Sequence, residues 1–96
     1  MMILVSYDVC TEDNAGKTRL RRVAKTCEQY GQRVQKSMFE CLVPPDILVR
    51  LKNALEKEMD KKKDSIRIYY LGNNWEKRVE HIGANEGYNP EGFLII

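Results

Sequence analysis

Apolar side chains recur along this chain with a period that switches between two residues and three to four residues. Residues 2–9 alternate between two faces, which predicts a strand. Residues 17–30 place apolar side chains at every third or fourth position, which predicts a helix that ends at Gly31. Residues 32–36 and 37–43 then predict two short strands or one long bent ribbon.

The second half of the chain adds one more helix and one more strand. Pro44 and Pro45 suit the first turn of a helix, which we expect to continue into the lysine run at residues 61–63. Its apolar face consists of Leu48, Leu51, Leu55 and Met59. Residues 65–71 alternate again and predict a strand, after which the chain becomes irregular and finishes on four apolar residues at 93–96.

This order of elements predicts a familiar class of α+β fold. The order βαββαβ is typical of the ferredoxin-like fold, an antiparallel sheet with both helices on one face. The chain of 96 residues is long enough for a single domain. We expect a core fold in residues 1–72 and a C-terminal dimerisation segment in residues 73–96.

The predicted sheet leaves one face without a layer of helices. Strand alternation puts Leu4 and Asp8 on that face, together with Tyr69 and Leu71 of the last strand. An apolar patch on this face and an apolar tail both favour a homodimer. We expect the two sheets to face each other, and a short strand at residues 92–96 to cross to the edge of the partner's sheet.

Composition bears on where the protein is located in the cell and on whether it can bind zinc. The longest apolar run is far shorter than the ~20 residues of a transmembrane helix, and no signal peptide is predicted, so we expect a cytoplasmic protein with no membrane partner. Cys10, Cys27 and Cys41 are widely spaced and His81 is the single histidine. A four-ligand zinc site is therefore not expected, and we expect Cys27 and Cys41 to be reduced core residues.

A carboxylate ends the first apolar strand. Burying an ionised Asp8 would cost several kcal/mol without a cation, a metal or hydrogen-bond donors. One explanation is that Asp8 caps the strand and begins the turn-rich loop of residues 10–16. The other is a magnesium site, because two sheets that pair about a twofold axis can place one divalent ion between two Asp8 side chains. Such an ion could polarise a phosphate and generate hydroxide.

The first helix is strongly basic on its outer side. Residues 17–25 carry five positive charges and no negative charge: Lys17, Arg19, Arg21, Arg22 and Lys25. Arg33 follows the helix and adds another positive charge. Basic helix faces are often merely solvated, but arginines without acidic partners four residues away favour binding to a phosphate backbone.

Several of these features together resemble one known family. They are the tripeptide Tyr7-Asp8-Val9, the arginine-rich first helix, the final strand, and residues 30–41, which read Tyr-Gly-Gln-Arg-Val-Gln-Lys-Ser-Met-Phe-Glu-Cys. Over nearly its whole length the chain is similar to the small second protein of the CRISPR adaptation module, found beside the integrase in CRISPR loci. Residues 67–74 and 79–84 resemble the branch found in subtype I-C loci.

The resemblance implies partners and an activity. It implies a ferredoxin-like homodimer that binds duplex DNA about to become a spacer and bridges two integrase dimers in a heterohexamer-type complex. Members are also described as metal-dependent nucleases that act on RNA or on double-stranded DNA. Carried over by position, Asp8 is the metal ligand, with one Mg²⁺ or Mn²⁺ between the two Asp8 of the dimer, and Tyr7 is a second catalytic residue. The family's ribbon residues fall on Arg33, Ser37 and Phe39, and its DNA-facing positions fall on the basic residues of the first helix.

Three functions stay open at this point. The first is a bridging, DNA-binding subunit with phosphodiesterase activity at Asp8, and the second is the same scaffold without catalysis. The third is an RNA-recognition module, because that fold shares this strand order. Against the third, residues 30–41 lack the glycine-aromatic pattern of such modules, and the open face carries Asp8 rather than stacked aromatic rings.

Overall fold

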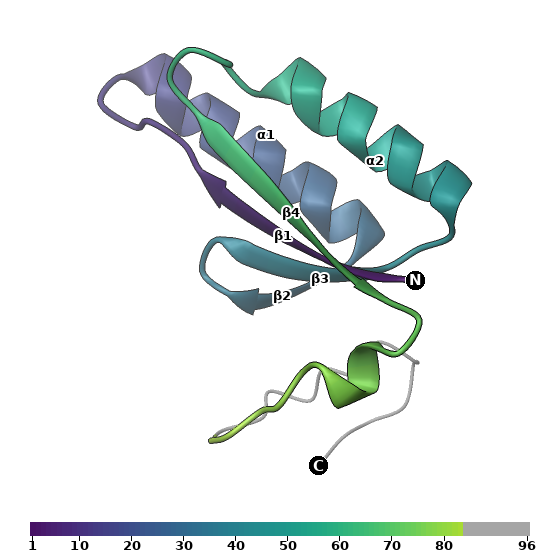
Figure 1. Cartoon of the computed structure of the whole chain (residues 1–96). Coiled ribbons are helices and arrows are strands. Elements are labelled where there is room, and N and C mark those ends of the chain that lie inside the picture. The colour runs from purple at the N-terminus through teal and green to yellow at the C-terminus, as the bar shows by residue number, and fades with distance from the viewer. Residues whose placement is uncertain (84–96) are drawn as a thin grey trace.

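Four strands form one antiparallel sheet in the order β2-β3-β1-β4, and two helices lie against one of its faces (Figure 1). The computed structural model describes residues 1–83. In chain order, the elements are β1 (Met2–Asp8), α1 (Asn14–Tyr30), β2 (Gln32–Gln35), β3 (Met38–Leu42), α2 (Pro45–Glu58), β4 (Ser65–Gly72) and the short 3₁₀ helix η1 (Trp75–Lys77). This arrangement confirms the predicted α+β, ferredoxin-like fold.

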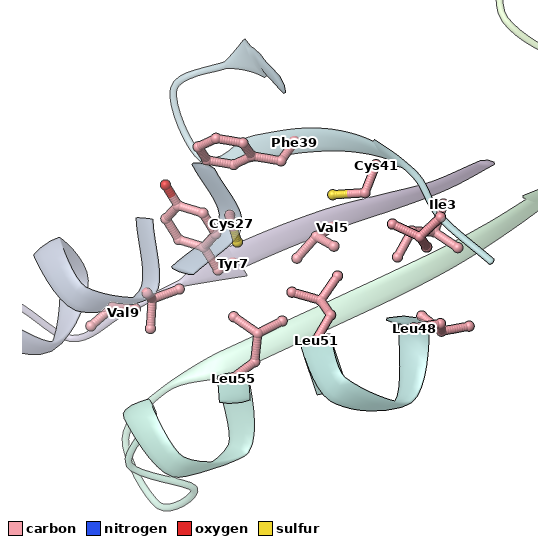
Figure 2. Close-up of a cluster of buried hydrophobic side chains, with 12 residues drawn as sticks. Ile3, Val5, Tyr7, Val9, Cys27, Phe39, Cys41, Leu48, Leu51 and Leu55 are labelled. Carbon is pink, nitrogen blue, oxygen red and sulfur yellow. The ribbon is translucent and has the colours of Figure 1, made fainter. Parts of the chain in front are cut away.

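β1 is a central strand that pairs with β3 on one side and with β4 on the other. Its two faces are those that the alternation predicts, because Ile3, Val5 and Tyr7 lie in the core whereas Asp8 is exposed. The core lies between the sheet and the helices (Figure 2). Its other buried members are Val9, Val23, Cys27, Phe39, Cys41, Val43, Leu48, Leu51 and Leu55.

α1 begins at Asn14, earlier than the apolar spacing predicts. Asp13 acts as the N-cap, because its Oδ1 accepts a hydrogen bond from the Gly16 N–H at 2.7 Å. This bond satisfies one of the backbone donors that the first turn of a helix leaves unpaired. At the other end, Gly31 terminates the helix as predicted, and its N–H donates to the Cys27 carbonyl at 3.0 Å.

α2 starts at the predicted prolines but ends at Glu58, before the lysine run. The expectation that the helix continues into residues 61–63 is wrong because Asp60 organises a turn there. Oδ1 of Asp60 accepts a hydrogen bond from the Lys62 N–H at 2.9 Å, and its carbonyl accepts one from the Asp64 N–H at 2.8 Å. The lysines therefore lie on a tight turn between α2 and β4.

Two of the three cysteines are fully buried free thiols, as predicted. Burial raises the pKa of Cys27 on α1 to about 12 and the pKa of Cys41 on β3 to about 11. A thiol with so high a pKa stays protonated near neutral pH and is a poor nucleophile and a poor metal ligand. The two side chains fill the core beneath α1 (Figure 2).

The sheet face opposite the helices is called the open face below. Alternation and register place on it Leu4, Ser6 and Asp8 of β1, Met38 and Glu40 of β3, and Ser65, Arg67 and Tyr69 of β4. Leu4 and Tyr69 lie directly opposite each other, as the predicted apolar patch requires. The predicted crossing strand at residues 92–96 lies outside the described residues. No helix within residues 1–83 is long and apolar enough to cross a membrane.

Gly31 packs closely against β3 at the point where α1 turns into β2. A β-carbon on Gly31 would overlap the carbonyl oxygen of Glu40 and lie 2.5 Å from Sγ of Cys41. Gly31→Ala should therefore lower the free energy of unfolding by about 1–3 kcal/mol, because this overlap outweighs the ~0.5 kcal/mol gained by restricting the unfolded chain. Urea denaturation measures the change. Gln29→Ala, at an exposed position nearby on α1, is the control and should change little; an equal result for both variants would contradict the prediction.

Candidate nucleic-acid and metal site

Asp8 is exposed at the end of β1, opposite Ser65 of β4. Its carboxylate forms no ion pair or side-chain hydrogen bond with any of residues 1–83. In a single chain Asp8 therefore carries no burial penalty, contrary to what its place at the end of an apolar strand indicates. A solvent-facing carboxylate with free oxygens is available to a cation or to a second molecule.

The described residues of one chain do not by themselves assemble a metal site around Asp8. Within residues 1–83 no three His, Cys, Asp or Glu side chains gather closely enough to hold an ion. Magnesium can be held by one or two carboxylates when water and phosphate oxygens complete its coordination. The oxygen donors of Asp8 thus fit Mg²⁺ or Mn²⁺ in kind, whereas one carboxylate is at the lower limit in number.

Tyr7 points to the opposite side of the sheet from Asp8. Its side chain is 4% exposed and stacks on Phe39 with the ring centroids 6.1 Å apart (Figure 2). Its hydroxyl donates a hydrogen bond to the Lys36 carbonyl at 3.5 Å. Burial raises the pKa of Tyr7 above its ordinary value, against the opposing charge of Arg33. The structure therefore places the phenol on the core side, where it packs against Phe39, and does not bring it together with Asp8 in a single chain.

Residues 32–42 form two strands rather than one bent ribbon, and their hairpin lies beside the end of β1. Phe39 is fully buried, and the guanidinium of Arg33 lies over its ring at 4.9 Å from the centroid. Arg33 also donates to the Lys36 carbonyl at 2.6 Å and pairs with Glu28 at 3.4 Å. The Ser37 carbonyl accepts a hydrogen bond from the backbone of β1 at 3.0 Å. The predicted ribbon residues therefore hold the hairpin against α1 and β1, and Arg33 already has partners within the chain.

A buried carboxylate lies elsewhere, at Asp64 in the turn before β4. Its Oδ2 accepts hydrogen bonds from Nε of Arg19 and from the Asp60 N–H, each at 2.8 Å. Its Oδ1 accepts from the Cys10 N–H at 3.1 Å and from Nη2 of Arg19 at 3.3 Å. The Asp64 side chain is 0% exposed and that of Arg19 is 16% exposed. This network joins the loop after β1, the helix α1 and the turn before β4.

The network changes the role of one predicted DNA-binding residue. Because both the Nε and Nη2 groups of Arg19 are bound to Asp64, its guanidinium is committed within the chain. The remaining basic residues of α1 are exposed and form no ion pair within residues 1–83. These residues, called the basic surface below, are Lys17, Arg21, Arg22 and Lys25.

The partners of Asp64 also set its protonation. Burial alone would raise the pKa of Asp64, but the hydrogen bonds from Arg19 and from the backbone N–H groups of Asp60 and Cys10 outweigh this effect and lower the pKa. The carboxylate is therefore ionised at neutral pH. Its ionisation stabilises the fold above the unfolded-state pKa of roughly 4, and this stabilisation is lost as the pH falls through the lower folded-state pKa.

Sequence reasoning missed Asp64, although a signal was present. Like Asp8, it adjoins an apolar strand, but it directly follows the lysines of residues 61–63 and so looks like part of a solvated charge cluster. The two carboxylates differ in burial, since Asp64 is buried and Asp8 is exposed.

Comparison with known proteins identifies the family. A sequence model of the family described as CRISPR associated protein Cas2 matches residues 1–79. The chain belongs to the Cas2 family. This confirms the resemblance to the small second protein of the CRISPR adaptation module.

Individual Cas2 relatives match the whole chain or most of it. The CRISPR-associated endoribonuclease Cas2 of Nitratidesulfovibrio vulgaris is 57% identical over 96 residues, which cover 100% of this chain and 94% of that protein. The CRISPR-associated endonuclease Cas2 of Halalkalibacterium halodurans is 52% identical over 96 residues and covers 100% of both chains. The crystal structure of Streptococcus pyogenes Cas2 at pH 6.5 has a TM-score of 0.75 and 58% sequence identity, covering 86% of this chain and 100% of that chain. The Cas2 fold described above is thus shared with a solved structure.

Replacing Asp64 tests the buried network of this Cas2-family chain. Asp64→Asn should lower the free energy of unfolding at pH 7 by about 3 kcal/mol. Arg19 loses its ionic partner, and the buried NH₂ group of the asparagine faces N–H donors with which it cannot form a hydrogen bond. The difference from wild type should shrink as the pH falls below about 4, where the unfolded chain becomes protonated, and through the lower pKa of folded wild-type Asp64. Urea denaturation at several pH values measures both effects.

Glu56→Gln is the matched control for Asp64→Asn. It also removes one carboxylate from an ion pair, but Glu56 and Lys61 are exposed and 3.7 Å apart, so little change is expected. Equal stability of Asp64→Asn and wild type at pH 7 would show that the network does not stabilise the fold.

Proposed function

We propose that this Cas2-family protein acts in spacer acquisition as a homodimer that binds duplex DNA and bridges two integrase dimers. The observation that carries the DNA-binding part is the basic surface of α1, whose four side chains have no carboxylate partner within residues 1–83. A phosphate backbone supplies the missing negative charge. Binding through such a surface is electrostatic, so it depends on salt and is insensitive to base sequence.

The proposed homodimer rests on the open face. Tyr69 is 43% exposed there and lies opposite Leu4, so apolar surface remains in contact with water in a single chain. A second copy related by a twofold axis would cover this patch with the same patch. β4 is an edge strand, and residues 92–96 are the proposed strand that a partner adds to it.

A metal-dependent phosphodiesterase activity at Asp8 is the second part of the proposal. The relatives include one named an endoribonuclease and one named an endonuclease, and we take RNA and duplex DNA as the candidate substrates. In the proposed dimer, the two Asp8 carboxylates together hold one Mg²⁺ or Mn²⁺. When bound, such an ion polarises a phosphate and makes a bound water more acidic. Tyr7 takes no part, because it faces the core.

The alternative function is a non-catalytic scaffold, and replacement of Asp8 distinguishes it from the nuclease. In that case the carboxylate serves only the dimer or the end of the strand, and its replacement changes neither metal binding nor cleavage. DNA binding by the basic surface is common to both alternatives, so it cannot distinguish them.

The assignment to the subtype I-C branch is part of the same proposal. It rests on the resemblance of residues 67–74 and 79–84. A CRISPR array and an integrase gene of that subtype beside the gene would support it, and a neighbourhood of another subtype would contradict it.

Charge reversal on the basic surface tests DNA binding. The triple variant Arg21→Glu, Arg22→Glu and Lys25→Glu should weaken duplex binding for every sequence and lower the salt slope by about three, one for each lost phosphate contact. Fluorescence anisotropy over a series of salt concentrations measures both. Arg19 is left unchanged because its replacement would disturb the buried pair with Asp64.

A matched control distinguishes an effect of the basic surface from an effect of net charge alone. Reversing Lys61, Lys62 and Lys63 to Glu makes the same change in net charge on the turn before β4. If that variant loses as much affinity and salt slope as the α1 variant, the basic surface is not the DNA-binding face.

Asp8→Asn tests the metal site with two independent readouts. Calorimetric titration with Mn²⁺ should show loss of the tight site, because an amide oxygen lacks the charge that the ion requires. Metal-dependent cleavage of labelled RNA and duplex DNA should fall by at least about 100-fold, since the ion acts only when held at the site. Light scattering should give the dimer mass for both proteins. Unchanged metal binding and cleavage would leave the non-catalytic scaffold as the function.

A further inference from the structure

Arg67 shares the open face with Asp8. In the antiparallel pairing of β1 with β4, Asp8 lies opposite Ser65 and Ser6 lies opposite Arg67. Asp8 and Arg67 are therefore diagonal neighbours, roughly 7–8 Å apart at their α-carbons in sheet geometry. An arginine side chain is long enough to reach over that distance, so the guanidinium of Arg67 can contact an anion that lies beside Asp8.

The guanidinium of Arg67 is largely free. In a single chain it is exposed, and its one side-chain hydrogen bond within residues 1–83 is a long one of 3.4 Å to the Tyr69 hydroxyl. It forms no ion pair with any carboxylate of the described residues. Arg19 and Arg33 differ in this respect, since each is paired with a carboxylate inside the chain.

The open face needs a positive group if a nucleic acid is to approach Asp8. A carboxylate and a phosphate repel each other, and the basic surface of α1 lies in the helical layer on the other face of the sheet (Figure 1). Tyr7 cannot offset this repulsion, because its hydroxyl lies on the core side, where it donates to the Lys36 carbonyl. Arg67 is the cation that the register brings to the Asp8 side of the sheet.

We propose that Arg67 binds a phosphate oxygen of the nucleic acid strand that lies at Asp8, and so positions that strand for the site. This inference rests on the proposed function of the open face. The guanidinium offers two parallel N–H donors to phosphate oxygens, a geometry that lysine cannot reproduce. Arg67 offsets the repulsion between Asp8 and the phosphate, whereas the basic surface supplies affinity along the rest of the duplex.

The test measures duplex binding and cleavage by the full-length protein carrying Arg67→Gln or Arg67→Lys. Arg67→Gln should lower duplex affinity about tenfold and the salt slope by about one, as expected for one charge-assisted phosphate contact. Arg67→Lys should keep the salt slope and recover part of the affinity. Arg50→Gln is the matched control, because Arg50 is exposed on α2 on the other side of the sheet.

A double-mutant cycle locates the contact without relying on cleavage. In the absence of metal, Asp8→Asn should raise duplex affinity by removing a repelling charge. This gain should change when Arg67→Gln is already present, because groups that contact the same phosphate do not act additively. Additive effects of the two substitutions would overturn the proposal, and so would an Arg67→Gln salt slope equal to that of wild type.

Two further outcomes distinguish this proposal from the nuclease proposal and from a role of Arg67 in the dimer interface. If wild-type protein cleaves no nucleic acid but the cycle shows coupling, the nuclease proposal fails and the phosphate contact of Arg67 stands. If Arg67→Gln turns the dimer into a monomer by light scattering, Arg67 pairs with the partner's Asp8 in the interface, and the phosphate contact is overturned.

Discussion

The buried pair of Arg19 and Asp64 is the interaction on which the arrangement around Asp8 depends. Its carboxylate holds the backbone of the loop directly after β1 and the backbone of the turn directly before β4, while its guanidinium comes from α1. The backbone pairing of β1 with β4 places Ser65 opposite Asp8 and Arg67 opposite Ser6. The pair joins the loop and the turn that adjoin this end of the ladder and ties both to α1.

The sheet keeps structural and chemical roles on separate faces. Tyr7, Phe39 and Cys41 lie on the core side of the sheet, where they pack with Cys27 of α1. Burial there raises the pKa of Tyr7, Cys27 and Cys41 and keeps these groups neutral. Asp8 and Arg67 lie on the open face, where both are exposed in a single chain. Because adjacent residues of a strand point to opposite faces, a motif that is continuous in sequence can be divided completely in space.

The same division of roles applies to the arginines. Five basic residues stand close together in the first helix, yet Arg19 is turned toward Asp64 while its neighbours face solvent. The helical period of 3.6 residues decides this, since Arg19 lies on the side that meets the turn before β4. Arg33 is held by Phe39 and Glu28 in a similar way. A count of positive charges therefore overestimates the surface that can meet a phosphate backbone.

The sequence alone was enough for the main elements, their order and the fold, because alternation and helical spacing are local properties of the chain. The family was found through the resemblance of residues 7–9 and 30–41 to known motifs. The sequence also placed Asp8 correctly on the open face at the end of β1. It did not determine the start of α1 or the end of α2, where the Asp13 cap and the Asp60 turn add hydrogen bonds that apolar spacing does not contain. Only the tertiary structure decided which carboxylate is buried and which arginine it binds, because the partners in that pair stand 45 positions apart and meet through packing.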